Sequence, residues 1–319
     1  MKSIIDSVQL MRGIAALSVV FCHLIIFDEG NFGVDLFFCI SGFIMMLVTE
    51  KNYNGFLQKR FLRICPLYFL LTIGKFSMGF IMPNLLRDPN ISVTVLLRSF
   101  LFIGGNEIMV GVGWTLCYEM FFYFLFFLAF KINHKNRHII ATLFLAIIVL
   151  IGLLVKNTNE YFLFYTQPII LEFAFGIWAY KFLYSNFKIA KSKLMESIFI
   201  IAAISIYSSL FFIKLPVNRL ISAGIPTFIV FILFFISLEN HRIPKFFIVL
   251  GNISYSLYLT HTFVITAFSK LIIDIEHEIT PLSILGSVIA ICFSLGVAYT
   301  SWYLIENKLT NWIKNKVKL

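Results

Sequence analysis

Long apolar stretches separated by short polar segments run along almost the whole chain. About ten of them have the length of a membrane-crossing helix. We place them at 8–27, 32–49, 64–82, 113–130, 139–155, 162–184, 194–213, 219–238, 246–272 and 281–303. A further apolar segment, 92–103, is too short to cross a bilayer and predicts an interfacial or re-entrant helix. The pattern therefore predicts an all-α fold, that of a polytopic integral membrane protein.

The composition agrees with this prediction. Hydrophobic residues make up 60% of the chain, charged residues 13%, and the mean hydropathy is +0.91. The apolar stretches leave no room for an extramembrane region, so we expect residues 1–319 to form a single membrane-embedded domain with no appended soluble domain. The five cysteines show no metal-ligand spacing, and neither a metal nor a bound cofactor is expected.

The net charge of +10 does not indicate a nucleic-acid partner, because the basic residues gather in short connecting loops. The ends of the chain and every second loop hold several lysines and arginines. The alternate loops hold only Arg87, Lys156, Lys214 and Arg219. Basic loops stay in the cytoplasm, so we expect a cell membrane (inner or plasma) location with both termini cytoplasmic.

Arg12 and His23 lie within the first expected span. Polar and ionisable groups inside a bilayer are expensive and mark functional sites. Their spacing of eleven residues puts them on one face of a helix, about 16 Å apart along its axis. The alternative is that Arg12 snorkels to the headgroups while His23 makes an interhelical hydrogen bond.

Three more titratable residues, Asp35, Glu119 and His261, are expected with His23 in the outer half of the membrane. A neutral histidine beside a carboxylate can take the proton from a hydroxyl nucleophile. We therefore consider His23, Glu119 and Asp35 as catalytic candidates. A helix N-cap is the alternative for Asp35, and a contact between helices is the alternative for His261.

Arg60 and Arg63 stand one turn apart at the cytoplasmic mouth of the third span. Arginines in this position suit bidentate phosphate contacts. The rise of about 16 Å from Arg12 to His23 has the order of length of a pantetheine arm. An acyl-CoA could thus anchor its phosphates near Arg12, Arg60 and Arg63 and present its thioester beside His23. A transporter or flippase with a proton relay through His23, Glu119 and His261 is the alternative, although no inverted repeat is evident.

Five segments carry most of these residues. In chain order they are Gln9–His23, Gly33–Phe43, Arg60–Tyr68, Gly113–Tyr123 and Ile253–His261. In this order they resemble the motifs of the membrane acyltransferase-3 family, over the whole chain. Gln9 replaces an aspartate that many members carry, and this departure is most like the exopolysaccharide O-acetyltransferase branch.

The resemblance implies transfer of an acyl group, commonly acetyl, from cytosolic acyl-CoA to a hydroxyl of an extracytoplasmic glycan or lipid-linked glycan. It also implies that Arg12 and His23 are an essential pair and that Arg60 and Arg63 are the cytoplasmic arginines. We expect acetyl-CoA or another acyl-CoA as donor substrate, and the lipid bilayer as surroundings.

The remaining candidates would hold the acceptor or support the site. They are Trp114, Tyr118, Ser254, Tyr258 and His261. For Trp114 and the tyrosines, anchoring at the membrane interface is the alternative. Gly251 and Asn252 are interpreted as the entry turn before the ninth expected span. Lys75, Arg98 and Glu172 also lie in or beside apolar stretches and have no assigned role.

Overall fold

The structure, a computed structural model, describes residues 2–24, 31–50, 55–86, 91–184, 192–213, 216–238, 241–275 and 279–317. Within these residues the chain forms helices and turns, with no strand. The α-helices are α1 (Lys2–Phe21), α2 (Phe32–Val48), α3 (Phe56–Ile81), α4 (Val93–Phe100), α5 (Trp114–Ile132), α6 (Arg137–Leu154), α7 (Glu160–Tyr165), α8 (Leu171–Tyr184), α9 (Lys193–Ser209), α10 (Ile225–Leu238), α11 (Lys245–Leu271), α12 (Pro281–Ser301) and α13 (Thr310–Val317). Short 3-10 turns are η1 (Pro83–Leu85), η2 (Gly111–Gly113) and η3 (Pro168–Ile170), and π-helical turns are η4 (Leu220–Gly224) and η5 (Trp302–Leu309).

Seven helical segments of the described chain are long and apolar enough to cross a membrane. They are Phe56–Ile81, Gly111–Ile132, Arg137–Leu154, Glu160–Leu183, Leu220–Leu238, Lys245–Leu271 and Pro281–Lys316. Helices α1 and α9 are not among them, and α2 is apolar but shorter, with 17 residues. The all-α prediction is thus confirmed for the described residues, and the seven candidate spans support a multi-pass membrane protein, whereas the total of about ten spans stays a prediction.

Several helices begin or end away from their expected bounds. Helix α1 ends at Phe21, where the His23 N–H bonds to the Val20 carbonyl at 3.1 Å, so His23 lies in the turn beyond the helix. The expected sixth span is interrupted at Pro168, because proline cannot donate the helical hydrogen bond. Helix α4 has eight residues and a length of about 12 Å, too short to cross a bilayer.

Glycines let the central helices approach backbone to backbone. A Cβ on Gly42 of α2 would lie 2.0 Å from the Phe173 carbonyl oxygen, and one on Gly176 of α8 would lie 1.8 Å from that of Cys39. A Cβ on Gly251 of α11 would lie 2.1 Å from the Gln9 carbonyl oxygen of α1. Small residues at helix contacts are how membrane helices gain packing energy. The interpretation of Gly251 and Asn252 as an entry turn before the helix is wrong, since both residues lie inside α11.

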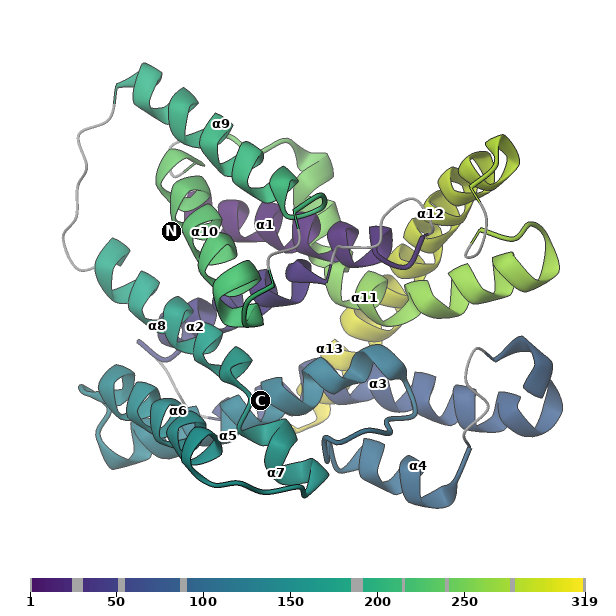
Figure 1. The fold of residues 1–319 in the computed structure, drawn as a ribbon, viewed down its shortest axis with the longest axis horizontal. Helices are drawn as coiled ribbons and strands as arrows, with labels where there is room; N and C mark the ends of the chain where they lie inside the picture. Colours follow the sequence, from purple (N-terminus) through teal and green to yellow (C-terminus); the bar gives the residue numbers. More distant parts are fainter. Residues whose placement is uncertain are drawn as a thin grey trace.

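These contacts put α1, α2, α8 and α11 at the centre of the molecule. Helix α1 packs on both α2 and α11, and α2 packs on α8. In Figure 1, α3 to α7 lie together in the lower half of the view, while α1, α9 and α10 occupy the upper half. Helix α12 packs on α11, and α13 turns back to contact α3.

We expect Gly176→Ala to lower the free energy of unfolding by at least about 1–3 kcal/mol, because its methyl group would overlap the Cys39 carbonyl. Thermal unfolding of the detergent-solubilised protein measures the effect. Gly74→Ala in α3 is the control: nothing lies within 4 Å of the position that its methyl group would take, so stability stays equal or rises slightly. Equal melting of both variants would contradict close α2–α8 packing.

Candidate active site

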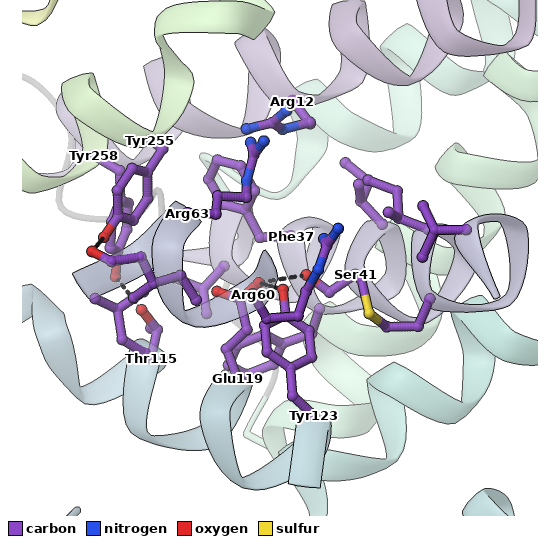
Figure 2. Close-up of a pocket in the computed structure, with 18 residues that line it drawn as sticks. Arg12, Phe37, Ser41, Arg60, Arg63, Thr115, Glu119, Tyr123, Tyr255 and Tyr258 are labelled. Atoms are coloured by element: carbon purple, nitrogen blue, oxygen red, sulfur yellow. Dashed lines mark hydrogen bonds between the residues drawn. The ribbon is translucent and has the colours of Figure 1, made fainter. Parts of the chain in front are cut away.

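Three arginines and a glutamate face one another across a cavity of about 260 Å³ at the centre of the helices, here called the central cavity. Arg12 comes from α1, Arg60 and Arg63 from α3, and Glu119 from α5. Figure 2 shows the three guanidinium groups above and beside the Glu119 carboxylate. Helix α3 begins at Phe56, so both of its arginines lie in its first turns. The structure thus brings together the predicted phosphate-binding residues and one predicted catalytic carboxylate.

Glu119 is held by two hydroxyl groups. Ser41 of α2 donates to Glu119 Oε1 at 3.0 Å, and Tyr123, one turn further along α5, donates to the same oxygen. A carboxylate this far inside an apolar helix needs such partners, because an unpaired buried charge is costly. These two bonds fix the Glu119 carboxylate in the cavity wall, near the three arginines.

Arg12 is positioned by a hydrogen-bonded chain from α11. Asn252 accepts from Gln9 Nε2 at 2.9 Å, and Gln9 Oε1 in turn accepts from Arg12 at 3.1 Å. This chain requires the close contact of α1 with α11 at Gly251, next to Asn252. Gln9 therefore orients the guanidinium as a neutral acceptor.

The central cavity adjoins a second one of about 340 Å³, here called the basic cavity. Its lining consists of Gln9, Arg12, Lys59, Arg60, Arg63, Asn252, Trp302, Glu306, Thr310 and Lys314. The three arginines line both cavities. Glu306 accepts a hydrogen bond of 2.6 Å from Ser256, which holds this carboxylate on the α11 side. Five cations around one space suit a polyanion such as a phosphate-bearing ligand.

His23 lines a third cavity of about 660 Å³, here called the histidine cavity, whose walls are mostly apolar. The His23 ring lies 5.0 Å from that of His261. His261 is fully buried, and its Nδ1 donates to the Leu257 carbonyl at 3.0 Å. Trp114 and Lys75 line the same cavity, which gives Lys75 a place at a candidate site.

The expected grouping of all the titratable residues with His23 is not what the structure shows. Glu119 lines the central cavity, whereas His23 lines the histidine cavity. Asp35 is fully buried, lines none of the three cavities, and accepts from Arg219 at 3.2 and 2.7 Å through both carboxylate oxygens. Arg219 also donates to the Asn31 carbonyl at 2.8 Å. The N-cap alternative for Asp35 is wrong, because Asn31 precedes the first residue of α2.

The other candidates divide in the same way. Tyr258 lines both the central and the histidine cavities. Tyr118 donates to the Phe164 carbonyl at 2.6 Å, and Ser254 donates to the Gly251 carbonyl at 2.8 Å; neither lines any of the three cavities. Their contacts are between and within helices.

Sequence reasoning missed several residues of the site. They are Ser41, Tyr123, Arg219, Asn252 and Glu306. Tyr123 had a signal, since residues four apart on a helix are neighbours and Glu119 was already a candidate. The others have none, because their partners are far away along the chain.

Two residues without an assigned role have structural partners. Arg98 pairs with Glu160 at 3.6 Å, and its guanidinium lies 5.3 Å from the Tyr161 ring centroid. Glu172 is fully buried beside Asp35 and Arg219. A Cβ on Gly224 would lie 2.7 Å from Glu172 Oε1, so the π-helical turn η4 leaves room for this carboxyl group.

Comparison with known proteins gives two matches. A family model described as an acyltransferase domain matches residues 5–303. The chain is also 29% identical over 262 residues to the "Exopolysaccharide production protein ExoZ" of Rhizobium meliloti (strain 1021). The aligned region covers 76% of this chain and 79% of that protein. No solved structure matches the chain.

Arg219→Ala is expected to destabilise the protein by about 3–5 kcal/mol, because it leaves the buried Asp35 carboxylate without its cation. Adding Asp35→Ala to this variant removes the orphaned charge and restores part of the loss. Thermal unfolding of the single and double variants measures both effects. If Arg219→Ala melts like the unaltered protein, the ion pair does not support the fold, and a direct catalytic role for Asp35 gains weight.

Proposed function

The chain belongs to the acyltransferase-3 family, and from this premise we propose that it moves an acyl group, acetyl by preference, from cytosolic acyl-CoA to a hydroxyl of an exopolysaccharide or its lipid-linked precursor. The observation that carries the proposal is the set of three arginines shared by the basic and central cavities. They form a continuous cationic lining from the surface of the helices to Glu119.

The basic cavity is the proposed site of the CoA phosphates. Arg60 and Arg63 offer planar forks for bidentate contacts, and Lys59 and Lys314 add charge. Lys59 and Lys314 come from segments that the positive-inside rule assigns to the cytoplasm. Thr310 of α13 donates to the Leu62 carbonyl at 3.5 Å, which holds these two segments together. This proximity supports a cytosolic donor and cytoplasmic termini.

The acceptor hydroxyl is proposed to enter from the histidine cavity. There His23 takes the hydroxyl proton as the oxygen attacks the thioester carbonyl; the carbon–sulfur bond breaks as the ester bond forms. The CoA thiolate leaves toward the arginines and takes up the proton that His23 removed, which restores the neutral imidazole. Glu119 lies among these arginines in the central cavity and is proposed to balance their charge. Trp114 offers an aromatic face to a sugar, and His261 supports His23 from behind.

Asp35 is proposed to act as a positioning residue. It holds Arg219, whose guanidinium lies 5.9 Å from the Trp114 ring centroid. The pair thereby ties the outer end of α2 to the wall of the histidine cavity. Such an arrangement orients the acceptor side of the site without touching the reacting atoms.

Arg60→Ala and Arg63→Ala are each expected to raise the KM for acyl-CoA about ten- to a hundredfold and to change kcat less, since phosphate contacts far from the thioester act as uniform binding. Initial rates against acyl-CoA concentration measure the effect. Arg242→Ala, an exposed cation from a loop of the same expected side, is the control for membrane insertion. An unaltered KM in correctly inserted variants would exclude the phosphate role.

Sealed vesicles test the whole proposal. Inside-out vesicles given labelled acetyl-CoA are expected to deposit the label covalently on lumenal glycan, while right-side-out vesicles given the same donor stay inactive. His23→Ala is expected to abolish transfer at unchanged membrane abundance, and His241→Ala, an exposed histidine paired with Glu196, is expected to keep it. Glycan movement without covalent label indicates the transporter alternative, and activity of right-side-out vesicles alone would overturn the cytosolic donor.

A further inference from the structure

The central and histidine cavities are separated by a wall with two principal members. Val34 of α2 and Tyr258 of α11 are the residues that line both cavities among the described part of the chain. Val34 is 2% exposed and Tyr258 is 5% exposed, so both are firmly packed. Val34 and Tyr258 therefore form the boundary that the two cavities share.

Tyr258 is fixed in this wall by its hydroxyl group. It donates to the Val112 carbonyl at 2.8 Å and lies 2.8 Å from Thr115 Oγ1, which completes the hydrogen bonding of the phenol. Val112 belongs to η2 and Thr115 to the first turn of α5. The ring is therefore braced between α11 and α5, as Figure 2 shows for Thr115 and Tyr258.

The opposite side of the wall is equally fixed. Phe37, three residues after Val34 on the same face of α2, places its ring edge-on to Tyr258 at 5.8 Å between centroids. Helix α2 cannot move closer to α1, because the two backbones already touch at Gly33. A Cβ on Gly33 would lie 2.3 Å from the Ala15 carbonyl oxygen of α1. Both sides of this shared boundary are thus closely packed, so the space that they leave depends on side-chain size.

We infer that Val34 and Tyr258 determine which acyl groups the protein transfers, by admitting an acetyl group to the His23 side and stopping longer chains. This inference rests on the proposed function, because it assumes a thioester arriving from the arginines and a hydroxyl activated by His23. A rigid apolar wall discriminates by volume, and each methylene too many costs about tenfold or more in kcat/KM. The acyl group is thereby selected before it meets the acceptor.

The test compares acetyl-CoA and butyryl-CoA as donors for the same membranes and the same acceptor. Val34→Ala removes two methyl groups from the wall and is expected to raise the butyryl-to-acetyl ratio of kcat/KM about tenfold or more. Because both donors are measured on one preparation, the ratio does not depend on how much of the variant folds.

Val48→Ala is the matched control. It makes the same change on the same helix in the lining of the same cavity, but about 21 Å along the axis from Val34. The ratio is expected to stay within about twofold of that of the unaltered protein. An equal rise of this ratio in both variants would show that cavity volume alone sets selectivity. It would overturn the inference that Val34 and Tyr258 select the acyl group.

A second pair of variants examines the brace on Tyr258. Thr115→Val removes the hydroxyl that contacts the phenol and is expected to raise the same ratio several-fold, whereas Thr115→Ser keeps the hydroxyl and the selectivity. Acetyl transfer with a ratio unchanged in both Val34→Ala and Thr115→Val overturns this inference alone. Absence of transfer from either donor in the unaltered protein overturns the proposed function and this inference with it.

Discussion

The backbone contact between α1 and α11 is the constraint on which the candidate site depends. Gly251 lets the two helices approach so closely that a Cβ at this position would overlap the Gln9 carbonyl oxygen. That distance brings Asn252 to Gln9 and, through Gln9, fixes Arg12. A bulkier residue at 251 would push the helices apart and break a chain of hydrogen bonds that continues into the cavity. The packing of α1 on α11 thus determines how the Arg12 guanidinium is oriented.

The second constraint is electrostatic. Arginines gathered inside a membrane protein repel one another and lose hydration, so they persist only where acidic groups and hydrogen bonds offset both costs. Glu119 lies among them in the central cavity, and Glu306 lies among them in the basic cavity. The resulting lining changes from cationic at one end to apolar at the other, where His23 lies. Such polarity suits a ligand with a charged end and a small apolar end.

The candidate residues could be predicted individually from the sequence, but their grouping could be predicted only in part. Arg12 and Glu119 were candidates because they lie in apolar stretches, and Arg60 and Arg63 because they stand at the mouth of the third expected span. The structure brings all four together. Asp35 was expected beside His23 from its depth alone, yet it pairs with Arg219, a residue counted only as a loop cation. Depth along a span says how far a residue lies from the surface, and it says nothing about which neighbouring helix its face meets.

The sequence by itself determined the helical, multi-pass architecture and the chain order of the motif residues, because both follow from the length and spacing of apolar stretches. Only the tertiary structure decided which faces of the helices meet. The physical reason is that lipid tails are as apolar as leucine, so a helix face that contacts lipid and one that contacts protein have similar apolar residues in the sequence. The contacts of Ser41 with Glu119 and of Gln9 with Asn252, and the shared place of Val34 and Tyr258 between two cavities, therefore arise from close helix packing, which leaves no periodic signal in the chain.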